Sequence, residues 1–246
     1  MDRHVLAAIS IAGTSLDLLG GLYLAYDLLG GKHGPLRTLT RGVTYAAMYA
    51  VAYGIPLGWR FGLFAGLTHG FTLAFEFSRV ARQGDVYGLG FDALFSLMRG
   101  TGFGLGLYHD FGRKFAVIFA SLSTVGQIFA YSRGVRPGMD YEAAARPHIT
   151  RGQFMAAVNR TIGYVFTGLI CGLMAQGSYS IAFALKIGFA IGIATAFGNF
   201  LTPYIEWLAE TLPARRLGVF GICLILTGFM LQSVQYWTAL LDIPLT

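Results

Sequence analysis

The sequence predicts an all-helical protein that crosses a lipid bilayer several times, and three observations lead to this fold class. Of the 246 residues, 55% are hydrophobic and 12% are charged, against roughly 25% charged residues in an ordinary soluble domain. The mean hydropathy is +0.59. The apolar residues form long continuous runs, as bilayer-crossing helices do with about 20 residues each, and not the short alternating segments of a membrane barrel.

Eight apolar runs are expected to be membrane spans, and together they make residues 1–246 a single transmembrane domain. The first run resembles a signal peptide because Arg3 precedes it. However, Asp17 interrupts the run and Asp27 stands where a small-residue cleavage site belongs, so we predict an uncleaved first span. The runs cover residues 5–29, 36–58, 61–78, 87–109, 115–133, 152–176, 179–203 and 216–240.

Basic residues in the loops orient the predicted spans, because Lys and Arg stay preferentially on the cytoplasmic side while Asp and Glu count little. One side receives 4 of them, Arg3, Arg60, Arg113 and Lys114, and the other side receives 11. This split predicts a cell (inner) membrane protein with both termini outside and with anionic lipid at its basic cytoplasmic face. The larger set consists of Lys32, Arg37, Arg41, Arg79, Arg82, Arg133, Arg136, Arg146, Arg151, Arg215 and Arg216.

An internal repeat is expected within the chain, over residues 36–82, 87–136 and 147–210. Arg41, Arg99 and Arg160 are spaced 58 and 61 residues apart, and each precedes an aromatic residue by four positions. The repeat predicts three helical hairpins of the same orientation, spans 2–3, 4–5 and 6–7, flanked by spans 1 and 8. The small residues that match between the first and third units are Gly66, Gly70 and Ala74 with Gly188, Gly192 and Ala196.

The hairpins predict a polar layer in the cytoplasmic half of the membrane. Counted from the outer turns, each arginine lies at a depth similar to that of a polar residue on the returning helix, because helices rise 1.5 Å per residue. An arginine in hydrocarbon needs such a partner. Arg41 has the alternative of lying at the interface and reaching the headgroups. The expected pairs are Arg41 with Glu76, Arg99 with Gln127, and Arg160 with Asn199.

Ionisable residues inside the predicted spans are candidates for a substrate or ion pathway, because charges in hydrocarbon are costly and are usually functional. Two of them have structural alternatives: His69 could be neutral and hydrogen-bonded, and Lys186 could reach the outer interface. Their mixed signs disfavour a pore lined by one kind of charge. The candidates are Asp17, His69, Asp92, Arg99, Arg160 and Lys186.

Several function classes lack support in the sequence. No phosphate-binding loop, zinc-binding helix, nucleophile elbow or clustered Cys/His set occurs, so we expect no cofactor, no metal and no enzymatic activity. His109 and Asp110 could ligate a metal but are typical of a polar turn. The net charge of +6 comes from dispersed loop residues, which does not indicate nucleic-acid binding.

Two functions from different classes remain. The first is a transporter or channel-like protein for a small polar solute or ion, with its site on the axis of the hairpins. The second is an accessory or scaffolding subunit of a larger membrane complex, and either role is compatible with a homo-oligomer or with other membrane subunits as partners. A lipid-modifying enzyme is a third class without a catalytic set. Transport predicts a hydrated cavity lined by Arg99, whereas the subunit role predicts a dry core with paired charges.

Overall fold

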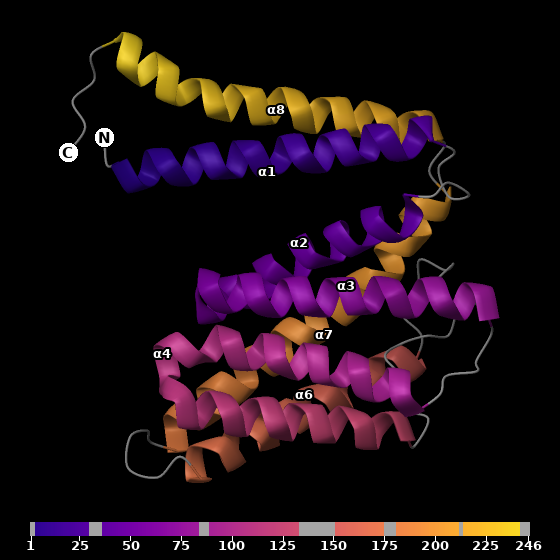
Figure 1. The fold of residues 1–246 in the computed structure, drawn as a ribbon, viewed down its shortest axis with the longest axis vertical. Coiled ribbons are helices and arrows are strands. Elements are labelled where there is room, and N and C mark those ends of the chain that lie inside the picture. The colour runs from indigo at the N-terminus through magenta and orange to yellow at the C-terminus, as the bar shows by residue number, and fades with distance from the viewer. Residues whose placement is uncertain are drawn as a thin grey trace. The chain divides into compact units, whose positions relative to one another are not determined.

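The computed structural model describes residues 3–29, 36–83, 89–132, 151–174, 181–211 and 214–241 (Figure 1). Every secondary-structure element in this part of the chain is a helix, which confirms the predicted all-helical class. The chain divides into two compact units. The first comprises Met1–Thr40 and Thr211–Thr246, and the second comprises Arg41–Glu210.

The first unit is built on two long helices that lie side by side, α1 (Arg3–Leu28) and α8 (Ala214–Leu240) (Figure 1). Glycines make this close approach possible. A Cβ at Gly20 would lie 2.5 Å from the carbonyl oxygen of Gly221, and a Cβ at Gly13 would lie 2.7 Å from that of Gly228. Real side-chain carbons need about 3.5 Å or more, so small residues determine how the two helices pack.

The second unit is formed mainly by helices that follow the predicted spans. They are α2 (Arg37–Leu57), α3 (Trp59–Gln83), α4 (Leu89–Ser132), α6 (Arg151–Met174) and α7 (Ile181–Thr211). Two turns depend on glycine. Gly58, between α2 and α3, has a φ of 91°, and Gly112, inside α4, has a φ of 77°. Non-glycine residues seldom adopt such angles, so glycine is required at both positions. The chain turns at each of them, and α4 therefore consists of two successive helices.

Three pairs of helical segments in the second unit approach closely at glycines. A Cβ at Gly66 in α3 would lie 2.6 Å from the Cα of Ala50 in α2. In α4, a Cβ at Gly104 would lie 2.9 Å from the Cβ of Ala120, beyond the turn at Gly112. Between α6 and α7, a Cβ at Gly168 would lie 2.7 Å from the Cα of Gly188. Small residues therefore hold each segment against the one that follows it.

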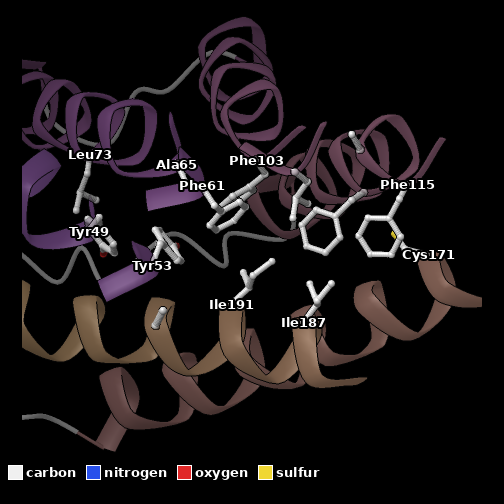
Figure 2. Packing of buried hydrophobic residues seen from close by; sticks show 14 of the residues in the cluster. Tyr49, Tyr53, Phe61, Ala65, Leu73, Phe103, Phe115, Cys171, Ile187 and Ile191 are labelled. Carbon is white, nitrogen blue, oxygen red and sulfur yellow. The ribbon is translucent and has the colours of Figure 1, made fainter. Parts of the chain in front are cut away.

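The core of the second unit is aromatic (Figure 2). Phe103 lies at its centre, with its ring centroid 5.7 Å from that of Tyr53, 5.8 Å from that of Phe61 and 6.1 Å from that of Phe119. The contacts with Tyr53 and Phe119 are edge-on, the geometry that the ring quadrupoles favour. Isoleucines of α7 pack against these rings. This core fixes the helices that position the polar residues described below.

Four described helical segments are long and apolar enough to cross a membrane, which indicates a membrane protein. They are His4–Tyr26, Gly90–Ser132, Ile181–Thr202 and Arg216–Leu240. The predicted eight spans are not confirmed. For example, α3 has 25 residues, but its hydropathy is lowered by polar side chains such as His69 and Glu76. Several basic residues behind the predicted orientation lie outside the described residues, namely Lys32, Arg133, Arg136 and Arg146.

Candidate functional site

A cavity of about 290 Å³ lies within the second unit, where α3, both halves of α4, α6 and α7 meet. Each of these segments contributes a polar side chain to its wall. His69 comes from α3, Arg99 and Gln127 from the two halves of α4, Asn159 from α6 and Thr195 from α7. The volume is near the lower end of the usual range for ligand pockets, roughly 300 to 1,000 Å³. The cavity therefore has room for a small solute.

Among the described residues of the cavity wall, Arg99 is the only Lys, Arg, Asp or Glu, and it is 2% exposed. Its Nη2 lies 2.7 Å from Oε1 of Glu76, in a buried ion pair. Its Nε donates a hydrogen bond of 2.7 Å to Oγ1 of Thr72, and its Nη1 donates one to the hydroxyl of Tyr131. The Tyr131 hydroxyl donates in turn to Oε1 of Glu76 at 3.1 Å. The guanidinium is thus held by three side chains from α3 and α4.

The expected pairing of Arg99 with Gln127 is not the one that the structure contains. The counterion of Arg99 is Glu76, which the sequence placed opposite Arg41. A carboxylate balances a buried guanidinium in a way that a neutral amide cannot, so Glu76 takes this position. Gln127 instead lines the same cavity as Arg99. Depth along the helices placed Arg99 and Gln127 at one level, and both line the cavity, but depth did not identify the counterion of Arg99.

Two polar side chains in the cavity wall make no hydrogen bond within the part of the chain that the structure describes. Both the Nε2 and the Oε1 of Gln127 are buried and unsatisfied, and so is the Oγ of Ser123. Leaving a buried polar group unsatisfied costs about 1 to 3 kcal/mol each. Both residues belong to the cavity wall but their polar atoms are almost fully covered, so a bound polar molecule becomes their partner when the side chains turn toward the cavity.

His69 and Thr195 line another side of the cavity, and aromatic side chains contact them from behind. The ring of His69 lies 4.4 Å from that of Tyr49 and 6.2 Å from that of Phe103, measured between centroids. The hydroxyls of Tyr53 and Thr195 form a buried hydrogen bond of 2.7 Å between α2 and α7. His69 is 5% exposed. These contacts hold the histidine ring firmly at the cavity wall.

The other predicted site residues have different positions. In the second unit, Asp92 lies in the first turn of α4 and is 8% exposed, and Arg41 is buried in α2. Lys186 is exposed on α7. None of these three contributes to the wall of the described cavity. The side chains of two others, Arg160 in α6 and Asn199 in α7, lie outside the description.

Asp17 belongs to the first unit. Its Oδ2 accepts a hydrogen bond of 2.6 Å from Nε2 of Gln232, which joins α1 to α8. One end of the same interface is joined by Ser10, which donates to Oε1 of Gln235 at 3.0 Å. Asp17 therefore has a structural contact between these two helices, at the face where their glycines meet.

Sequence reasoning missed several residues of the site, although their spacing carried a signal. Thr72 and Glu76 are four residues apart on α3, and His69 precedes Thr72 by three. Such spacing places the three on one helical face. Ser123 and Tyr131 stand four residues before and after Gln127, so they form a second polar face in α4 (residues 89–132). Polar residues at intervals of four inside an apolar run would have identified both faces.

The described residues form an all-helical protein whose helices are apolar enough for a membrane and whose cavity has a mostly apolar wall with several polar groups in it. Among these residues, no group of three or more His, Cys, Asp or Glu side chains is placed to hold a metal ion. No protein family, curated protein or solved structure matches the chain. The function must therefore be argued from the site itself.

Proposed function

We propose that the protein is a multi-pass membrane transporter or channel-like protein for a small polar solute, with the cavity beside Arg99 as its solute site. The observation that carries this proposal is the unsatisfied amide of Gln127 in the wall of a cavity that Arg99 also lines. A membrane protein has to compensate every polar group that it buries. A transported solute that fills the cavity would supply the missing hydrogen bonds.

We further propose that the chain crosses the cell (inner) membrane eight times. Both termini would lie outside, and the basic loops would face anionic lipid on the cytoplasmic side. Three hairpins would surround the site. This proposal is supported by the recurring glycine contacts of α2 with α3, within α4, and of α6 with α7. It is also supported by the two turns at Gly58 and Gly112, which have a positive φ.

Access to the cavity is expected between the second half of α4 and α6. Gly126 and Gly163 both line the cavity and are exposed. A Cβ added at either position would meet no heavy atom within 4 Å. Helices that present glycine to open space leave a gap through which a small solute can pass.

The experiment is a transport assay in reconstituted vesicles with a panel of labelled polar solutes, comprising polyols, sugars, amino acids, amides and inorganic ions. Gly126→Trp should abolish the protein-dependent uptake, because the indole fills the cavity without displacing backbone. Gly90→Trp is the matched control, since Gly90 is also in α4 with open space around it but does not line the cavity. Uptake that survives Gly126→Trp, or no uptake of any solute, would refute the proposal.

An accessory subunit of a membrane complex is the second candidate, and one observation favours it. The charge of Arg99 is already balanced by Glu76 within the chain, and the subunit role predicts a core in which the buried charges are paired. Native mass spectrometry after gentle extraction distinguishes the two candidates. Isolation of the chain alone or as a small homo-oligomer supports transport, whereas co-purification with other membrane subunits at fixed stoichiometry supports the subunit role.

A further inference from the structure

We infer that the cavity selects an uncharged polar solute that carries both a hydrogen-bond donor and an acceptor, of the amide, urea or polyol class, and that it rejects small ions. This inference rests on the proposed function and narrows its substrate class. It excludes an inorganic or organic ion as the transported species. Three properties of the cavity lead to it: its charge balance, its free hydrogen-bonding groups and its size.

The charge balance comes from the Arg99 network. The positive charge of Arg99 is compensated by Glu76 at 2.7 Å, so an anionic ligand would give the buried site a net negative charge. A cation would face the guanidinium directly. Bringing a further charge into such a site is costly in a medium of low dielectric constant.

The free hydrogen-bonding groups define what the ligand must offer. Gln127 presents an unsatisfied donor, Nε2, and an unsatisfied acceptor, Oε1. The hydroxyl of Ser123, one helical turn away on the same face, is also unsatisfied and can donate or accept. A primary amide is complementary to a carboxamide in both directions, whereas acetate offers acceptors alone. A ligand with both functions can satisfy all three atoms at once.

The cavity has room for small solutes of this class. Its volume of about 290 Å³ corresponds to roughly ten water molecules at about 30 Å³ each. Urea, acetamide and glycerol fit within this space. Solutes of this size bury few apolar atoms, so hydrogen bonds provide most of their recognition.

The test compares two pairs of nearly isosteric solutes that differ in charge. Uptake of radiolabelled urea, guanidinium, acetamide and acetate is measured in vesicles with the full-length protein and in empty vesicles. Urea and acetamide should enter faster than into empty vesicles, whereas guanidinium and acetate should enter at the empty-vesicle rate. An ion that enters as fast as its neutral counterpart overturns the inference. Uptake of none of the four also overturns it, while the proposed function is judged separately by its wider solute panel.

Two variants test the physical reason. Gln127→Leu keeps the volume but removes both hydrogen-bonding atoms, so uptake of urea and acetamide should fall by about tenfold. Gln235→Leu in α8, outside the cavity, should leave uptake unchanged. Glu76→Gln leaves Arg99 without a counterion, so the uptake of acetate relative to acetamide should rise by about tenfold or more. If Gln127→Leu and Gln235→Leu behave alike, the cavity does not select the solute and the inference is wrong.

Discussion

The buried ion pair between Arg99 and Glu76 should contribute strongly to stability only as long as both partners are present. The two residues are 2% and 3% exposed, and their charged atoms lie 2.7 Å apart. Removing one partner leaves an uncompensated buried charge, which costs about 3 to 5 kcal/mol. Arg99→Met and Glu76→Gln should therefore each lower the free energy of unfolding by roughly that amount.

The double variant Arg99→Met/Glu76→Gln should be no less stable than either single variant, because it buries no unbalanced charge. Its hydrogen-bonding capacity is also retained, since the new amide at position 76 can still accept from Tyr131. The free energy of unfolding is measured by circular dichroism during titration of micelles with a denaturing detergent. At independent sites, the loss of unfolding free energy in a double variant equals the sum of the losses in the two single variants to within about 0.5 kcal/mol. Such a sum in Arg99→Met/Glu76→Gln would refute the reasoning.

Two further predictions concern helix packing. Gly66→Ala should destabilise the fold by about 1 to 3 kcal/mol, because its Cβ would lie 2.6 Å from the Cα of Ala50. Gly163→Ala, whose Cβ would have no heavy atom within 4 Å, should instead stabilise α6 by up to about 1 kcal/mol. Equal thermal unfolding midpoints for the two variants would contradict this prediction. Asp17→Leu removes the acceptor for Gln232 and should weaken the packing of α1 against α8. The measurement is amide hydrogen exchange, which should become faster in both helices. An unchanged exchange rate would show that the glycine contacts alone hold α1 against α8.

Much of the helical arrangement could be predicted because it depends on local properties. The runs predicted at 36–58 and 87–109 correspond closely to α2 and to the first half of α4. Gly112 has a positive φ, which turns the chain between the two halves of α4. Which helices cross the membrane is harder to predict from the sequence. For example, α3 is long enough to span a bilayer, but it contains polar residues that lower its hydropathy.

The candidate site could be predicted only in part. Arg99 and His69 stood out because ionisable residues in apolar runs are costly wherever they lie. Glu76 and Gln127 were also selected, but Arg99, which was expected opposite Gln127, is paired with Glu76. Thr195 carried no signal, since a Thr in a membrane helix is common and its hydroxyl can bond to its own backbone.

The sequence by itself determined the helical class, the apolar helices and the identity of the most costly buried charge. These follow from composition and from periodicity along one chain segment, where each residue contributes independently. Only the tertiary structure decided which carboxylate neutralises Arg99 and which polar atoms face a cavity. Such pairings depend on rotation and register between helices that are 23 or more residues apart in sequence, as Glu76 and Arg99 are. A shift of a single residue turns a helical side chain by about 100°, so depth along the helix fixes the level of a polar group but not the partner that it meets.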